Sequence, residues 1–238
     1  MVEHSNRDIL RVASARSLQE VLKPLGAAFA TRSGTAVDFF FGPVGTVQQH
    51  LDGGAAADVV ILSDVLIDAY AQAGKIIPES RKRVGRVGIM LAVREGAEAP
   101  DISTSERFKA ALLNARAIAC SDPAIGGSAG THFAALLKHF KIEDQVRDKL
   151  LKCASGVKTA ETVASGAADI GITLLPEMLP VKGVRVAAPL PDALQKYTTY
   201  VAAVSSLSAA PDVAGAFIRA AADPGQATAW QAAGVEPL

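Results

Sequence analysis

Four short turns rich in glycine, serine and threonine carry the residues best suited to bind a small anion. They are residues 14–17, 42–46, 126–131 and 155–159. Each precedes an expected helix, where backbone N–H groups without helical partners and nearby hydroxyls can donate to an anion. Capping alone explains any single turn, because Ser, Thr and Gly are common at helix starts. Four such turns in one chain favour a shared anion site.

Within these turns, two cations stand beside the neutral donors. Arg16 and Lys158 bring positive charge, and the guanidinium of Arg16 can grip a carboxylate through two hydrogen bonds. Ser17 also begins a capping-box pattern with Glu20, which predicts that its hydroxyl caps the following helix. The predicted ligand-binding residues are Ser14, Arg16, Ser17, Gly45, Thr46, Ser128, Ala129, Thr131, Val157 and Lys158.

The third turn also fits the G-x-S-x-G pattern of a hydrolase nucleophile elbow, with Ser128 as the nucleophile. That elbow needs a strand running directly into the serine and a histidine far downstream, and both are lacking, since the last histidine is His139. We therefore reject a serine hydrolase. His132 follows the turn closely enough to touch a ligand. It shares a helix face with His139, but without a metal-ligand pattern, so neither a metal nor a cofactor is expected.

Short apolar runs alternate with amphipathic segments and must position these turns. The expected strands are 9–13, 36–41, 59–62, 88–93, 117–120, 170–173, 184–187 and 198–204. The expected helices are 17–33, 44–51, 63–73, 105–114, 131–140, 142–151, 157–165, 211–222 and 226–233. This alternation predicts parallel βαβ units with helices on both faces of the sheet. Ligands of such sheets bind beyond the carboxyl ends of the strands, where the four turns lie.

The composition excludes several classes of protein. Lys and Arg total 24, as do Asp and Glu, so the chain lacks the basic excess of a nucleic-acid binder. Cys120 and Cys153 form no C-x-x-C motif and are expected to be separate core residues. No apolar run reaches the ~18 residues of a membrane span, so no membrane insertion is expected. The polar start lacks the features of a signal peptide, which indicates a periplasmic protein if one has been removed and a cytoplasmic protein otherwise.

Several segments together resemble the molybdate-binding-protein family of ABC transporter receptors. They are residues 13–18, 46–59, 121–123 with 129–130, and 166–172, in the family's order over nearly the whole chain. The resemblance implies the two-lobed type II periplasmic-binding-protein fold, an α/β fold in which each lobe is a mostly parallel sheet flanked by helices. Two crossing strands join the lobes, and the anion binds in the cleft. Lobe 1 would be residues 1–85 plus 200–238, and lobe 2 residues 86–199.

The resemblance carries the family's molybdate site only partly onto this chain. Ser17 matches the first serine, Ser128 and Ala129 keep the small third turn, and Val157 matches a backbone donor. The serine-rich second turn is replaced by residues 42–45, and the pocket tyrosine by Leu174. The loss of two polar contacts and the gain of Arg16 favour a carboxylate over molybdate or tungstate.

Residues 179–184 and 189–195 are similar to a divergent branch of this family that includes aconitate isomerase. Two main functions therefore stay open. The first is a monomeric solute-binding protein that closes over a small carboxylate or oxyanion for an ABC permease. The second is an isomerase that shifts a proton or double bond in a di- or tricarboxylate, with His132 or Tyr200 as acid–base candidates. A ligand sensor without a transporter is a third possibility.

Overall fold

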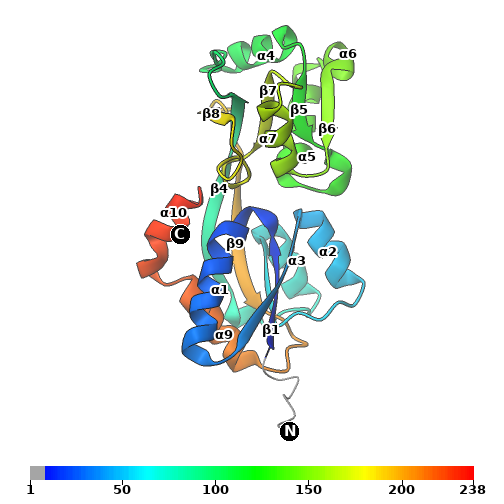
Figure 1. The fold of residues 1–238 in the computed structure, drawn as a ribbon. Helices are drawn as coiled ribbons and strands as arrows, with labels where there is room; N and C mark the ends of the chain where they lie inside the picture. The colour runs from blue at the N-terminus through cyan, green and yellow to red at the C-terminus, as the bar shows by residue number, and fades with distance from the viewer. Residues whose placement is uncertain (1–8) are drawn as a thin grey trace. The chain divides into compact units, whose positions relative to one another are not determined.

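The computed structural model describes residues 9–238, and it divides the chain into two compact units. The first unit ends at Arg86 and resumes with Thr198–Leu238, and the second is Val87–Tyr197. These limits differ by one or two residues from the division that the family resemblance implied. The chain passes from one unit to the other in β4 (Lys82–Arg94) and again at the start of β9 (Tyr197–Val204) (Figure 1).

In the first unit a central strand has parallel neighbours on both sides. Strand β1 (Ile9–Ala15) pairs in parallel with β2 (Ala36–Gly42) and β3 (Val59–Ser63), while β3 pairs antiparallel with β9. Buried residues run without a break from Val12 to Ala15, as expected for a strand covered on both faces. The carboxyl ends of β1, β2 and β3 therefore meet at one edge of the sheet.

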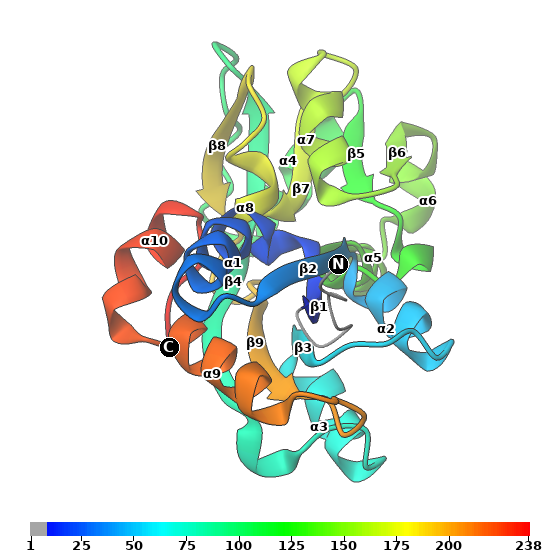
Figure 2. The same ribbon diagram turned by 60° about the horizontal axis from the view of Figure 1, so that its bottom comes forward.

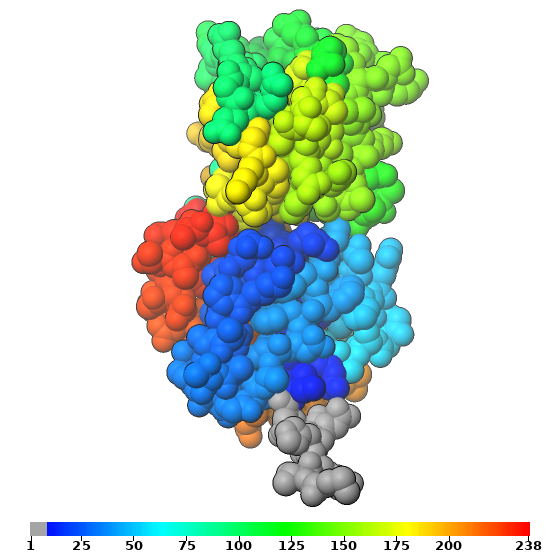
Figure 3. Space-filling model, viewed as in Figure 1, coloured from blue at the N-terminus to red at the C-terminus, as the bar shows by residue number. Residues whose placement is uncertain are grey.

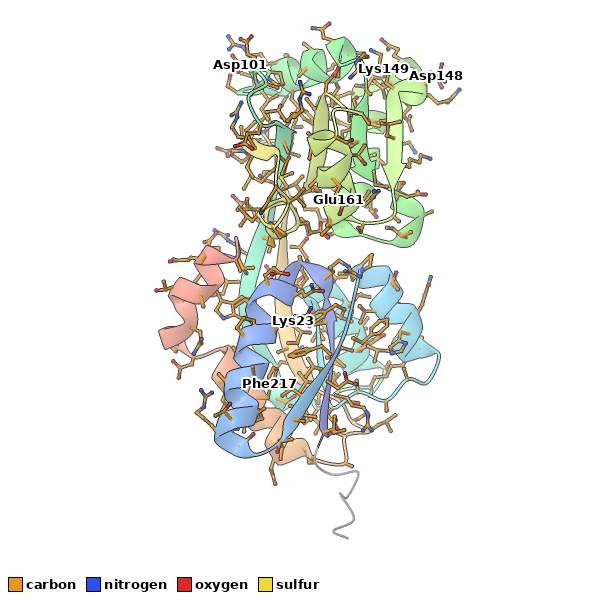
Figure 4. All side chains as sticks on the ribbon, in the orientation of Figure 1. Lys23, Asp101, Asp148, Lys149, Glu161 and Phe217 are labelled. Carbon is orange, nitrogen blue, oxygen red and sulfur yellow. The ribbon has the colours of Figure 1, made fainter. Side chains whose placement is uncertain are left out.

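Two pairs of helices cover this sheet. Helices α1 (Gln19–Ser33) and α9 (Pro211–Ala221) lie on one side and α2 (Val44–Asp52) on the other, together with α3 (Asp64–Gln72) (Figure 2). The ring of Phe217, labelled in Figure 4, meets the ring of Phe29 edge to face with centroids 5.3 Å apart. On the far side, Val47 and Ile67 complete the core. Both faces of the sheet are thus sealed by apolar side chains.

The C-terminal helix α10 (Ala227–Ala232) lies alongside α1, as Figure 3 shows in red and blue. Trp230 anchors it, since the indole is buried and its Nε1 donates to the carbonyl oxygen of Ala221 at 3.0 Å. A buried indole N–H needs such a partner, so this bond fixes how the helix docks.

The second unit has its own mixed sheet in the order β4-β7-β5-β6, with β8 (Val184–Pro189) also paired to β4. Strand β5 (Ile118–Ser121) is parallel to β6 (Leu150–Cys153) and to β7 (Ile170–Leu174), and β7 is antiparallel to β4. Helices α7 (Gly156–Ala164) and α8 (Leu175–Met178) pack on one face. The other face carries α5 (Ser128–Phe140) and α6 (Glu143–Val146), and Phe140 contacts Phe108 of α4 (Ser105–Asn114).

The two cysteines lie on neighbouring strands but on opposite faces of this sheet. Cys153 packs with Ala119 and Val163, whereas Cys120 faces Phe133. Both are buried and reduced, so the prediction of two separate core residues is confirmed. Burial raises the pKa of the Cys120 thiol to about 12.

One predicted helix is wrong over half its length. Residues 142–151 were expected to form a single helix, but α6 ends at Val146, a 3₁₀ turn follows at Arg147–Lys149, and β6 begins at Leu150. The charged residues of this segment obscured a short edge strand that is exposed at Leu151 and Lys152. Its pairing with β5, a non-local contact, overrides the local pattern. Within residues 9–238, every helix is too short or too polar to cross a membrane.

Candidate functional site

In the first unit the predicted residues gather where β1 ends. Ser14 is fully buried, and its hydroxyl donates to the carbonyl oxygen of Ala15 at 3.3 Å. A 3₁₀ turn, Arg16–Leu18, then leads into α1. The turn therefore presents Arg16 and Ser17 at the carboxyl edge of the sheet.

The capping box predicted at Ser17 is wrong. Helix α1 begins at Gln19, and the residue at its N-cap is Leu18, whose side chain has no polar atom to cap with. Instead the hydroxyl of Ser17 donates to the hydroxyl of Tyr200 at 2.7 Å, across 183 positions of sequence. Both side chains are buried, so each hydroxyl needs a partner inside the protein. This tertiary hydrogen bond joins the 3₁₀ turn that precedes α1 to strand β9.

Arg16 reaches toward the end of the neighbouring strand. The register of β1 and β2 places Ala15 opposite Gly42, and Nη2 of Arg16 donates to the carbonyl oxygen of Phe41 at 3.4 Å. Gly45 and Thr46 lie in the first turn of α2, just beyond Gly42, and are half-buried. The structure thus brings the first two predicted turns together at one edge.

In the second unit the glycine-rich turn proves to be part of a helix. Helix α5 starts at Ser128 rather than at residue 131, with Gly127 as its N-cap, so three predicted residues occupy its first turn. Ala129 is buried, and the hydroxyl of Thr131 donates back to the carbonyl oxygen of Gly127 at 2.9 Å. A side chain at Gly130 would overlap the backbone of Ser121, which explains the glycine there.

The fourth turn caps α7. The hydroxyl of Ser155 accepts from the backbone N–H of Lys158 at 3.1 Å, so this serine is an ordinary N-cap. Lys158 itself is exposed, and its Nζ lies 3.1 Å from Oε2 of Glu161, which is labelled in Figure 4. Val157 remains positioned as a backbone donor in the first turn of the helix.

Two donors stand out by their lack of a partner. Among residues 9–238, the buried side-chain nitrogen and oxygen atoms without a hydrogen-bond partner are Nε of Arg16 and Oγ of Ser128. A buried unsatisfied polar group costs about 1–3 kcal/mol, so it calls for an explanation. Both atoms belong to residues predicted to bind the ligand, one in each unit.

Both acid–base candidates, His132 and Tyr200, form hydrogen bonds within the protein. Nε2 of His132 lies 2.7 Å from the carbonyl oxygen of Leu194. A carbonyl can only accept, so Nε2 carries the proton and Nδ1 is the basic nitrogen. The hydroxyl of Tyr200 accepts from the hydroxyl of Ser17 at 2.7 Å. Among the described residues, His, Cys, Asp and Glu form no group of three that could hold a metal ion.

Sequence analysis missed an acidic residue beside α7. Oε2 of Glu177 accepts from the hydroxyl of Thr173 at 2.7 Å, and a side chain at Gly156 would overlap both groups. A Thr and a Glu four positions apart, directly after a strand, were the available signal. Nothing local showed that they would meet Gly156, the first residue of the helix that precedes this strand.

The profile of a family described as bacterial extracellular solute-binding protein matches residues 10–236. Aconitate isomerase from a Pseudomonas species is 29% identical to the chain, covering 96% of the chain and 88% of the relative. The molybdate-binding protein ModA of Escherichia coli is 24% identical over 82% of the chain and 76% of its own length.

The fold is that of solved binding proteins. The periplasmic molybdate-binding protein of Azotobacter vinelandii matches with a TM-score of 0.73 and 23% identity, covering 95% of this chain and 98% of its own. The expected type II periplasmic-binding-protein fold and the resemblance to molybdate-binding proteins are therefore confirmed.

Proposed function

Because the chain belongs to the bacterial extracellular solute-binding protein family, we propose that it binds a small organic carboxylate. The observation that carries this proposal is the buried Nε of Arg16, an N–H donor that has no acceptor. A carboxylate supplies two acceptor oxygens in the geometry of a guanidinium. Bound ligand would thus satisfy the first unit's unpaired donor.

The second unit supports the same chemistry with neutral donors. The hydroxyl of Ser128 has no partner, and it stands in the first turn of α5. Backbone N–H groups of that turn and of α7 favour negative charge through the helix dipole. A carboxylate group can accept from hydroxyl and backbone donors of this kind.

The direct test is isothermal titration calorimetry with citrate, tricarballylate, cis-aconitate and trans-aconitate, beside sulfate and molybdate. We expect at least one carboxylate to bind with a micromolar or lower Kd. The Arg16→Ala variant should weaken it strongly, while the exposed Arg32→Ala variant on α1 serves as the matched control. Tight binding of molybdate alone would overturn the proposal.

As a binding protein of this family, the chain would deliver its ligand to an ABC transporter outside the cytoplasm. This role predicts binding without turnover and a monomeric protein. Capture of the protein by its permease in reconstituted vesicles, dependent on ligand, would support it. Failure of liganded protein to stimulate any co-encoded transporter would favour the sensor or enzyme alternatives.

A second candidate is an isomerase that shifts a double bond in a small polycarboxylate. It is favoured by the similarity to aconitate isomerase, which extends over 96% of the chain. Here Tyr200 would donate a proton, and Nδ1 of His132 would accept one. A proton NMR time course with cis- and trans-aconitate in D₂O decides the matter. Protein-dependent new signals or deuterium uptake would establish turnover. Binding without any change in the ligand would favour the solute-binding protein.

A further inference from the structure

Glu177 places a carboxylate beside a helix start that was predicted to bind an anion. It lies in α8, the short helix that follows β7, and is half-buried. Its Oε2 accepts a 2.7 Å hydrogen bond from Thr173, whose side chain is fully buried. A hydroxyl anchored in the core therefore holds the carboxylate in place.

The carboxylate lies against the first residue of α7. A Cβ at Gly156 would overlap both Oε2 of Glu177 and the hydroxyl of Thr173, so the acidic group fills the space that a side chain would take. Gly156 immediately precedes Val157, the predicted backbone donor of this turn. The carboxylate is thus packed directly beside a donor that would otherwise attract any anion.

The charge of Glu177 matters because ligands differ in the group that they would place near the start of α7, either a charged oxygen or a hydroxyl. Two like charges about 5 Å apart repel by roughly 3 kcal/mol at the effective dielectric of a protein surface. A ligand hydroxyl at the same place would instead donate to the carboxylate, and bonds to charged groups contribute about 1.5–3 kcal/mol. A site gains specificity as much from such repulsion as from attraction.

We infer that Glu177 determines specificity by excluding fully deprotonated tetrahedral oxyanions, such as molybdate and sulfate, from the start of α7. A carboxylate ligand that places a hydroxyl there is favoured. The inference rests on the proposed function, since it requires the second unit's turn to receive ligand.

The test compares wild type with Glu177→Gln, which keeps the acceptor oxygen for Thr173 but removes the charge. Glu106→Gln is the matched control, because Glu106 is an exposed acid in α4 of the same unit. Kd values for molybdate, sulfate, citrate and tricarballylate are measured by calorimetry. Citrate and tricarballylate carry the same three carboxylates, but only citrate adds a hydroxyl.

We expect Glu177→Gln to tighten molybdate or sulfate binding at least tenfold and to narrow the preference for citrate over tricarballylate. Glu106→Gln should change neither. Thermal melting shows whether each variant is folded, and Glu177→Asp, which keeps the charge, must still exclude oxyanions.

The inference is overturned if wild type already binds molybdate or sulfate as tightly as any carboxylate, or if Glu177→Gln leaves oxyanion affinity unchanged. The proposed function fails separately, if no carboxylate binds wild type. A gain of oxyanion binding in Glu177→Gln would still support the inference in that case.

Discussion

The two units place opposite charges beside the turns that were predicted to bind an anion. In the first unit, the turn after β1 presents Arg16, whose guanidinium touches the end of β2. In the second, the turn before α7 is flanked by Glu177, which Thr173 holds in place. Backbone donors at helix starts are shared by any anion-binding protein of this kind, so they do not tell one anion from another. We therefore propose that these two side chains, rather than the backbone donors, set the selectivity for one anion over another.

The units also differ in how their hydroxyls are used. Ser17 is fully satisfied, because it donates to Tyr200 inside the core. The Oγ atom of Ser128 is buried as well, but it has no hydrogen-bond partner among the described residues. A paired hydroxyl stabilises the fold, whereas an unpaired one costs stability that a ligand can return. The first serine should therefore matter mainly for folding and the second mainly for binding.

Removing the cation should have the largest effect. We expect Arg16→Ala to weaken carboxylate binding by roughly 10–150-fold, which corresponds to about 1.5–3 kcal/mol for bonds to a charged group. Arg16→Lys should recover only part of this, because an ammonium cannot form two parallel bonds to a carboxylate. Calorimetry with the best carboxylate measures both. Equal affinity of Arg16→Ala and wild type would show that Arg16 does not contribute to carboxylate binding.

The outline of this site was predictable, because turns of Gly, Ser and Thr after strands have a local signature. Arg16 and Ser128 were identified in that way. The tertiary contacts around them were not, because those contacts come from elements far along the chain. The capping box at Ser17 obeyed every local rule, yet a buried tyrosine 183 positions away took the hydroxyl. Strand β6 was missed for the same reason, since its pairing with β5 is a tertiary contact.

Breaking the Ser17–Tyr200 bond should come next in size. Tyr200→Phe removes the acceptor and leaves a buried serine hydroxyl unsatisfied, which should cost about 1–2 kcal/mol of unfolding free energy. Ser17→Ala should cost a similar amount, and the double variant less than the sum, because the two groups interact. Urea unfolding of all four proteins gives this coupling. Strict additivity would show that the bond contributes nothing to stability.

Ser128 should show the opposite behaviour. Ser128→Ala removes an unpaired buried hydroxyl, so we expect the free protein to gain up to about 1 kcal/mol of stability. The same change should weaken ligand binding several-fold. Ser155→Ala is the matched control, since Ser155 caps α7 and its loss should destabilise by about 1 kcal/mol. A loss of stability in Ser128→Ala would mean that its hydroxyl is satisfied in the free protein.

The smallest expected effect concerns acid stability, where the units can again be compared. Burial opposes ionisation of Asp169, but hydrogen bonds from the backbone and side chain of Arg116 outweigh it and hold the pKa of Asp169 below its usual value. In the first unit, a hydrogen bond from Lys75 lowers the pKa of Asp52, which lies at the surface.

A carboxyl whose pKa is depressed by folding adds stability above its unfolded pKa near 4, and this is lost as pH falls through the lower folded pKa. Both carboxylates are more than one third exposed, so each contribution is discounted to under about 1 kcal/mol.

Asp169 also accepts from a backbone N–H, a donor that remains fixed when salt screens the ion pairs. We therefore expect Asp169→Asn to destabilise the protein more than Asp52→Asn at pH 7, and both differences to shrink toward pH 2. Urea unfolding at the two pH values, repeated in 0.5 M NaCl, measures this. If salt abolished the Asp169 effect as completely as the Asp52 effect, the backbone bond would carry none of it.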